Sequence, residues 1–148
     1  MRVYLGSDHA GFEYKEKVKG LLSGLGHSVE DQGPTSSASC DYPDFAIKVA
    51  RIVSGDPSSL GILVCGTGIG MSIAANKIHG ARAAVAASEY MARMSREHNG
   101  ANILCLGARV VDWTSAELCV KAFLAALPST EGRHALRRSI IDKAEAAP

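Results

Sequence analysis

Short apolar runs alternate along the chain with longer segments of mixed polarity. The runs are mostly rich in Val, Ile or Leu, and all but the second end in glycine or another small residue, which is typical of buried strands in a parallel sheet. They predict strands at Val3–Gly6, Ser28–Asp31, Gly61–Cys65, Arg82–Ala86 and Asn102–Gly107. The segments between them have helical periodicity and predict helices at Phe12–Leu25, Pro43–Ser54, Gly70–Lys77, Ser88–Asn99 and Thr114–Leu127.

Strict alternation of strand and helix predicts right-handed crossovers and a sheet covered on both faces. We therefore expect an α/β fold, doubly wound and Rossmann-like, with a five-stranded parallel sheet in a single domain spanning residues 1–148. Gly26 is placed to end the first helix, Asp41 to begin the second and Pro128 to stop the fifth. The last segment, 133–147, has a helical composition and is expected to reach outward to a partner subunit.

Composition narrows the class of protein. A chain of 148 residues with 47% hydrophobic positions can bury a core without disulfides or metals. A net charge of +1 and 5% aromatic residues argue against a nucleic-acid-binding surface. No apolar stretch is long enough to span a membrane, and Met1–Leu5 lead directly into Gly6-Ser7-Asp8, so we expect a soluble cytoplasmic protein without an export signal.

The cysteines give a further indication of the compartment. The chain contains four of them, at positions 40, 65, 105 and 119, and none has CxxC spacing. Reduced thiols in the cytoplasm therefore fit better than a disulfide framework or a zinc site.

Candidate chemistry lies at the ends of the predicted strands, where open parallel sheets bind ligands. The glycine-rich run Cys65–Gly70, C-G-T-G-I-G, joins the third strand to a helix. Alternate glycines allow close approach to the backbone and can direct several N–H groups at one anion. Two other interpretations remain: a dinucleotide-binding loop, whose third glycine would come one residue later, and a turn that only packs the helix on the strand.

Cys65 stands immediately before this predicted anion hole. A thiolate is favoured beside a helix N-terminus and N–H donors, so Cys65 is a candidate base or nucleophile. A cysteine at the end of a strand is otherwise more often an inert core residue, and only its position before the glycines favours chemistry.

Two pairs of neighbouring polar residues lie at the ends of other predicted elements. Asp8 and His9 follow the first strand, where a carboxylate beside an imidazole can orient sugar hydroxyls and transfer protons. His98 and Asn99 end the fourth predicted helix, where a helix C-terminus favours a protonated imidazole. The simpler interpretations are a solvated turn capped by Asp8 and a helix end closed by Asn99.

Arginines supply candidate anion ligands. Arg133 and Arg137 are four residues apart, so on a helix they share one face and can bind one dianion, with Arg109 as a third cation. Two arginines at this spacing can also simply form a solvated helix face.

Seven ordered motifs resemble those of the type B ribose-5-phosphate isomerases, a family that includes the galactose-6-phosphate isomerase subunits. The resemblance covers nearly the whole chain. The motifs are G-S-D-H-A-G (6–11), D-Y-P (41–43), C-G-T-G-I-G (65–70), A-A-N-K (74–77), R-E-H-N (96–99), G-A-R-V-V (107–111) and G-R-H-A-L-R-R (132–138).

The resemblance implies an isomerase that interconverts ribose 5-phosphate and ribulose 5-phosphate through a cis-enediolate, without metal or cofactor. It implies a homodimer, or a tetramer of two dimers, with active sites across the dimer interface. Cys65 would be the base, and Thr67 would assist proton transfer at the sugar oxygens. The N–H groups of Gly66, Gly68 and Gly70 would hold the enediolate, whereas the loop alone suggested a site for the phosphate.

The remaining roles implied by the resemblance concern the sugar ring and the phosphate. His98 of the partner subunit would open the furanose ring together with Asp8. Tyr42 and Asn99 would line the sugar. The expected phosphate ligands are His9, Arg109, Arg133 and Arg137.

One comparison within the family sharpens the assignment of the base, and one departure from the family bears on Arg133. One branch uses a glutamate at the position held here by Met71, which cannot accept a proton, so Cys65 is the candidate base. The segment 128–131, P-S-T-E, departs from relatives that carry a second glycine before Gly132, which affects how Arg133 approaches its ligand. The alternatives are an isomerase of a six-carbon sugar phosphate such as allose 6-phosphate or galactose 6-phosphate, a non-catalytic sugar-phosphate-binding subunit, and a dinucleotide-binding protein.

Overall fold

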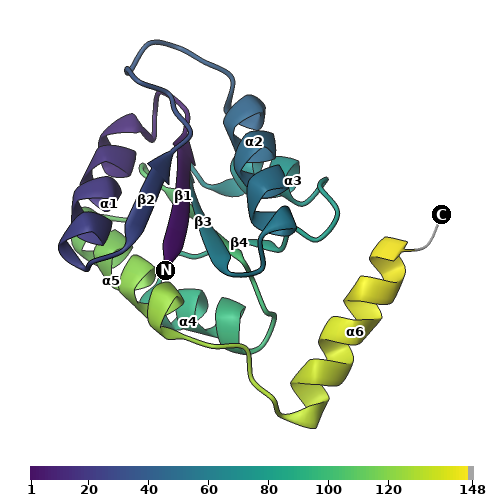
Figure 1. Cartoon of the computed structure of the whole chain (residues 1–148). Coiled ribbons are helices and arrows are strands. Elements are labelled where there is room, and N and C mark those ends of the chain that lie inside the picture. Colours follow the sequence, from purple (N-terminus) through teal and green to yellow (C-terminus); the bar gives the residue numbers. More distant parts are fainter. Residues whose placement is uncertain (147–148) are drawn as a thin grey trace.

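Five parallel strands form one sheet in the order β2-β1-β3-β5-β4 (Figure 1). The structure is a computed structural model that describes residues 1–146. The strands are β1 (Arg2–Ser7), β2 (Ser28–Asp31), β3 (Ser59–Cys65), β4 (Ala83–Val85) and β5 (Ile103–Gly107). β1 and β3 are neighbours although β2 lies between them in sequence, so the chain reverses its direction of travel across the sheet here. In sheets of this kind, ligands bind beyond the carboxyl ends of the strands at such a reversal.

Helices cover both faces of the sheet. They are α1 (Phe12–Gly24), α2 (Tyr42–Gly55), α3 (Ile69–Ala75), α4 (Glu89–Glu97) and α5 (Trp113–Ala125). Ile62 and Leu104 face a core shared with α1, α4 and α5, whereas their neighbours Leu63 and Cys105 face a second core shared with α2 and α3. The predicted doubly wound α/β fold is therefore confirmed. Among residues 1–146, no helix combines the length and apolar character needed to cross a membrane.

Most predicted boundaries hold to within two residues, and the differences have local causes. β4 starts at Ala83 because the N–H of Arg82 donates to the side chain of Asn102, 2.8 Å away, instead of to a strand. α5 ends at Ala125, before Pro128, because Ala126 already has an extended backbone with ψ of 148°. Gly26 closes α1 as predicted: its φ is +79°, and its N–H donates to the carbonyl of Ser23.

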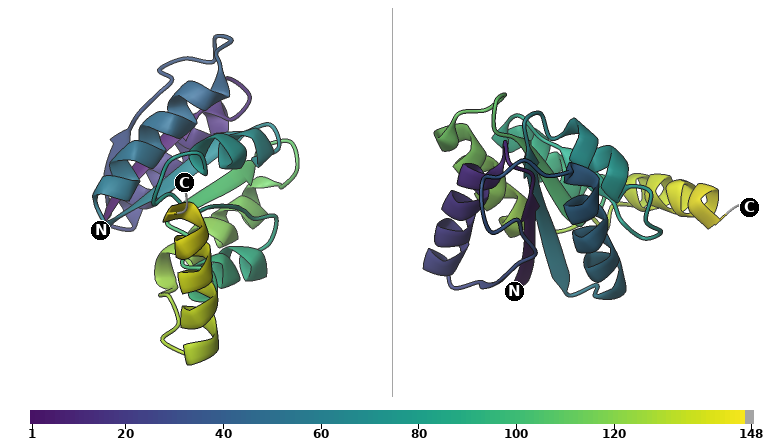
Figure 2. Two further views of the ribbon diagram at one scale, coloured as in Figure 1. Left: turned by 90° about the vertical axis from the view of Figure 1, so that its right-hand side faces the viewer. Right: turned by 90° about the horizontal axis from the view of Figure 1, so that it is seen from above.

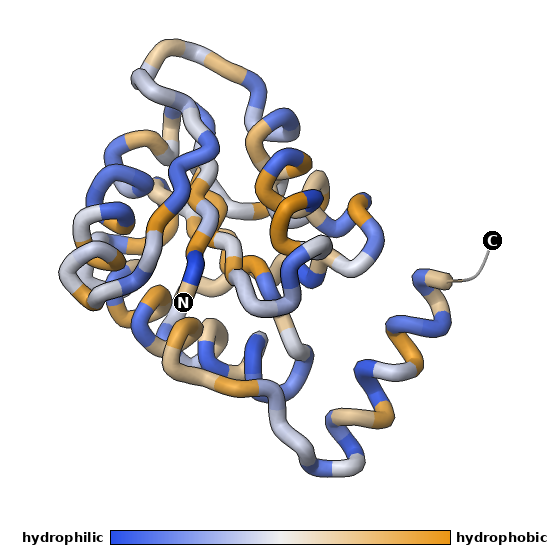
Figure 3. Tube along the Cα trace, in the orientation of Figure 1, coloured by the Kyte–Doolittle hydropathy of each residue, from blue (hydrophilic) through white to orange (hydrophobic). Residues whose placement is uncertain are grey.

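A sixth helix, α6 (Gly132–Ala146), projects away from the layers around the sheet (Figures 1 and 2). Its first half is tied to the end of α4, where Arg138 donates to the carbonyl of His98, and its second half to Arg82 through Asp142. Apolar and polar residues alternate along it (Figure 3), and the side chains of Leu136, Ile140 and Ile141 are exposed. Ala147, the last residue of the predicted helix, lies outside the described residues.

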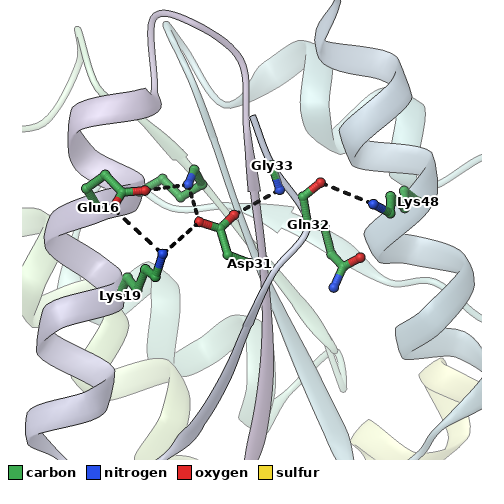
Figure 4. A network of polar contacts seen from close by, with 7 residues as sticks. Glu16, Lys19, Asp31, Gln32, Gly33 and Lys48 are labelled. Carbon is green, nitrogen blue, oxygen red and sulfur yellow. Dashed lines mark hydrogen bonds and ion pairs between the residues drawn. The ribbon is translucent and has the colours of Figure 1, made fainter. Parts of the chain in front are cut away.

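A buried lysine joins α1 to the end of β2. Lys15 is 1% exposed and pairs with Asp31 and Glu16, and Lys19 reaches Asp31 from the next turn (Figure 4). The second oxygen of Asp31 accepts a hydrogen bond from the N–H of Gly33 at 2.9 Å. The carbonyl of Gly33 in turn accepts from the N–H of Ser7 at 3.0 Å. The network therefore fixes the loop after β2 against the end of β1, beside Asp8.

Candidate active site

The carboxyl ends of β1, β3 and β5 bring three loops together around Cys65. The N–H of Asp8 donates to the carbonyl of Val64 at 3.2 Å. On the other side, the N–H groups of Ala108 and Arg109 donate to the carbonyls of Cys65 and Gly66 at 2.9 and 3.0 Å. Asp8, Cys65 and Arg109 thus lie on adjacent strand ends, as their positions in the sequence predicted.

Cys65 is the last residue of β3 and is 5% exposed. It belongs to the core cluster between the sheet and α2 and α3, which also includes Met71. Its sulfur, however, accepts a hydrogen bond from the N–H of Gly68 at 3.1 Å. An amide donor directed at a sulfur stabilises negative charge on it, so the thiol is placed for chemistry at the loop as well as for packing.

Cys105 shows the contrast with a purely structural thiol. It is fully buried on the neighbouring strand β5. Burial, with a smaller contribution from the nearby Cys65, strongly raises the pKa of Cys105. Cys105 therefore remains protonated and belongs to the core.

The glycine loop is shaped by close packing at two points. Gly68 has a φ of +79°, and a Cβ there would lie 3.1 Å from the carbonyl carbon of Leu106. A Cβ at Gly70 would lie 2.7 Å from the ring of Tyr42. These glycines therefore let the loop fit between the end of β5 and the start of α2.

Two N–H groups of the loop already have acceptors within the loop. The N–H of Gly68 is directed at the sulfur of Cys65, and that of Ile69 lies 3.3 Å from Oγ1 of Thr67. An anion bound here would be held by other N–H groups of the loop. Gly66 lies under Arg109, whose Nη1 would be 3.4 Å from a Cβ at that glycine, so a cation also borders the loop.

Asp8 and His9 occupy the turn between β1 and α1. Asp8 is 7% exposed, and its Oδ1 accepts a hydrogen bond from the N–H of Gly11 at 2.9 Å. The simpler interpretation of Asp8 as a turn residue thus accounts for one of its oxygens. His9 accepts a weak hydrogen bond at Nδ1 from the N–H of Cys40, 3.4 Å away, which links this turn to the loop that leads to Tyr42.

The remaining predicted site residues lie away from Cys65, on the side of the sheet where the strands begin. His98 and Asn99 follow α4 and precede the start of β5, whereas Cys65 pairs with Gly107 at its end, about 13 Å further along the strand. Arg133 and Arg137 lie on α6, close to His134 of the same helix. Within residues 1–146 no hydrogen bond or ion pair joins the two groups. One chain therefore brings together only part of the predicted site.

A second histidine accompanies His98. The imidazole rings of His98 and His134 are stacked, with centroids 4.1 Å apart and an angle of 8° between their planes. Arg133 lies beside this pair and donates from Nε to Nε2 of His134 at 3.3 Å, while also pairing with Glu131 at 2.9 Å. Sequence reasoning did not assign His134 a role, although it stands in the G-R-H-A-L-R-R motif. The buried Lys15 was missed as well, because it follows no pattern typical of a site.

Comparison with known proteins is consistent with this architecture. The family model described as Ribose/Galactose Isomerase matches residues 3–141. Ribose-5-phosphate isomerase B of Escherichia coli (strain K12) is 43% identical over 144 residues, which cover 97% of this chain and 96% of that protein. The ribose-5-phosphate isomerase B structure from Clostridium thermocellum is 48% identical, covers 98% of this chain and 97% of that one, and has a TM-score of 0.94.

A third comparison includes a bound sugar. The structure of ribose-5-phosphate isomerase B from Mycoplasma genitalium, which holds ribulose-5-phosphate, is 39% identical, with a TM-score of 0.94 over 99% of this chain and 97% of that one. The resemblance of the seven motifs is thus confirmed over almost the entire sequence. The chain belongs to the ribose/galactose isomerase family.

Proposed function

We propose that this protein interconverts ribose 5-phosphate and ribulose 5-phosphate without metal or cofactor, as a single domain in the cytoplasm. The names of its relatives and the ribulose-5-phosphate bound in one of them support a pentose phosphate as the substrate. The observation in this chain that carries the proposal is the hydrogen bond from the Gly68 N–H to the Cys65 sulfur. A sulfur held by an amide at the binding edge of the sheet suits a base that moves a proton between neighbouring carbons.

The reaction requires one proton to move between carbons and one between oxygens. The Cys65 thiolate takes the proton from C2 of the open-chain aldose, and charge develops on the oxygen at C1. The resulting enediolate is held by loop N–H groups, and donors already in place where charge develops lower the barrier. The thiol then returns its proton to C1, while Thr67 assists transfer between the oxygens, so that no proton is gained or lost overall.

The site is completed by a second copy of the chain. In one chain, Cys65 lies at the end of β3, whereas His98 lies before the start of β5, at the opposite ends of the strands. Helix α6 projects away from the sheet with exposed apolar side chains, which favour burial against a partner. In this homodimer, which can pair into a tetramer, His98 and Asn99 of one subunit serve the Cys65 site of the other. Ring opening is then the task of His98 with Asp8, and Tyr42 lines the sugar.

Side chains of both subunits bind the phosphate. His9 and Arg109 border the Cys65 loop, and Arg133 and Arg137 come from α6 of the partner. Arg133 is engaged with Glu131, a residue of the segment that departs from the relatives. The substrate phosphate therefore competes with a carboxylate for this arginine.

The direct test is conversion of ribose 5-phosphate to ribulose 5-phosphate by chelator-treated protein. We expect turnover that chelation leaves unchanged, and loss of at least about a hundredfold in Cys65→Ser, because general acid–base groups contribute that much. Cys40→Ser is the matched control, because this partly exposed thiol has no role in the proposed mechanism and the contact with His9 is made by the Cys40 backbone N–H, which the substitution keeps. Faster turnover of allose 6-phosphate or galactose 6-phosphate than of ribose 5-phosphate would contradict the assignment of substrate.

A further inference from the structure

His134 is the only side chain of α6, as far as the structure describes this helix, that is buried. It is 6% exposed and lies flat against the ring of His98. A helix that packs through one residue ordinarily buries an aliphatic or aromatic side chain, which has no polar atoms to satisfy. The imidazole at this position therefore calls for an explanation beyond packing.

The stacking contact with His134 leaves both ring nitrogens of His98 accessible. Stacking uses the face of the ring, and within residues 1–146 neither ring nitrogen of His98 has a hydrogen-bond partner. The backbone of His98 is fixed separately, because its carbonyl accepts from Nη1 of Arg138 at 3.3 Å. The residue is thus held in orientation while both nitrogens remain available to a substrate.

The charges around the pair favour a neutral His134. Arg133 and Arg137 of α6 face it, and Glu131, 3.6 Å from its Nε2, is the carboxylate that opposes them. Burial, followed by the effects of His98 and Arg133, lowers the pKa of His134, and Glu131 partly offsets this. A neutral His134 therefore places no second positive charge against the imidazole of His98.

We propose that His134 is a positioning residue for the ring-opening step: it holds the imidazole of His98 by stacking and leaves both of its nitrogens free to exchange protons with the sugar. This inference rests on the proposed function. Ring opening breaks the bond from C1 to O4, removes the proton of the C1 hydroxyl and delivers one to O4, so the acid–base group ends as it began. A ring free to tilt would perform both transfers less efficiently.

The test separates ring opening from proton transfer at carbon. Ribose 5-phosphate closes to a furanose through O4, whereas ribulose 5-phosphate cannot close one because O5 carries the phosphate. Exchange of the C1 hydrogen of ribulose 5-phosphate with deuterated solvent therefore reports Cys65 chemistry without ring opening. Turnover of ribose 5-phosphate reports both.

We expect His134→Leu to lose about tenfold or more in turnover of ribose 5-phosphate, while C1 exchange stays within about threefold of the wild type. His134→Phe, which keeps a flat ring, should recover most of the lost turnover. Ser139→Ala, which removes only a hydroxyl that donates to the carbonyl of Leu136 within α6, is the control for changes to the helix itself and should leave both rates unchanged.

Two outcomes would overturn the inference. In one, both His134 variants keep full turnover; in the other, turnover and C1 exchange fall together, which indicates a purely structural role. Retained exchange in His134→Leu also shows that the variant is folded. Failure of the proposed function is distinguishable, because the wild type would then neither convert ribose 5-phosphate nor exchange the C1 hydrogen.

Discussion

The N–H of Gly68 donates to the sulfur of Cys65 across a turn that only a left-handed residue can make, with φ of +79° at Gly68. The backbone conformation of one residue therefore controls the environment of the other. The same glycine approaches the carbonyl of Leu106, so a side chain there meets both strain and a close backbone contact.

Gly68→Ala should impair catalysis more than its effect on folding explains. The left-handed conformation costs a non-glycine residue roughly 1–2 kcal/mol, and relief of that strain would turn the amide away from the sulfur. We expect a fall in the free energy of unfolding of about that size, measured in urea, and a fall in kcat of about tenfold or more at temperatures where the variant is folded.

Gly20→Ala provides the matched control. Gly20 lies in α1 with open space where its Cβ would be, and the change should raise stability by about 0.5–1 kcal/mol without altering kcat. Unchanged kcat in Gly68→Ala would show that the amide has no role in the reaction.

Tyr42 and Gly70 should show energetic coupling. A methyl group at Gly70 would overlap the ring of Tyr42, so Gly70→Ala should displace the tyrosine and raise KM for ribose 5-phosphate. In a Tyr42→Ala background the same substitution meets no ring. The double-mutant cycle should therefore give a coupling of about 1 kcal/mol or more, and strictly additive effects on KM would contradict the proposed contact with the sugar.

Asp31 should contribute strongly to stability. Burial alone would raise the pKa of Asp31, but hydrogen bonds from Lys15, from the Gly33 N–H and from Lys19 outweigh burial and hold that pKa below its ordinary value. Asp31→Asn leaves the buried Lys15 with Glu16 as its remaining partner and should cost about 3 kcal/mol of unfolding free energy. Glu117→Gln, which breaks an exposed pair with Lys121, should cost less than about 1 kcal/mol.

The stabilisation that Asp31 provides should decrease as the pH falls. A carboxyl whose pKa is lowered by folding stabilises the protein fully above its unfolded pKa of about 3.9, and this contribution is lost as pH falls through the folded pKa. The stability difference between wild type and Asp31→Asn should accordingly be constant near neutral pH and shrink below about pH 4. A difference that grows on acidification would be inconsistent with the ion pair.

The separation of Cys65 from His98 predicts complementation between inactive variants. Cys65→Ala and His98→Asn homodimers each lack one group in every site. A mixed dimer has one site with both groups intact, so dissociating and reassociating an equal mixture should restore about a quarter of wild-type turnover. No recovery, with mixed dimers detected by mass spectrometry, would place both groups in a site made by one chain.

The sequence was informative where the signal is local. The three central strands β1, β3 and β5 were predicted because buried parallel strands must be apolar on both faces. The edge strands β2 and β4, which are less buried, were also predicted, from their place in the alternation of strands and helices. The Cys65–Gly70 loop was placed correctly between a strand and a helix, because closely spaced glycines directly after an apolar run are typical of a tight connection. The end of α5 was placed too late, because the composition remains helical beyond Ala125 although the backbone does not.

The features that were missed depend on how distant segments fold back. The stacking of His134 on His98 follows from the direction that α6 takes after residues 126–131, which no periodicity encodes. Lys15 occupies a buried helix position where an apolar residue is the rule, and it is paired there with Glu16 of its own helix and with Asp31 at the end of β2, whose placement depends on the fold. The assignment of site roles stays a prediction that the proposed variants test.

The central claim is that the Cys65 sulfur carries the proton between C1 and C2. The most direct measurement is deuterium exchange at C1 of ribulose 5-phosphate by Cys65→Ala, with binding of the sugar phosphate followed separately by calorimetry. The account predicts that binding persists while exchange falls by at least about a hundredfold. Exchange at a rate close to that of the wild type would contradict it.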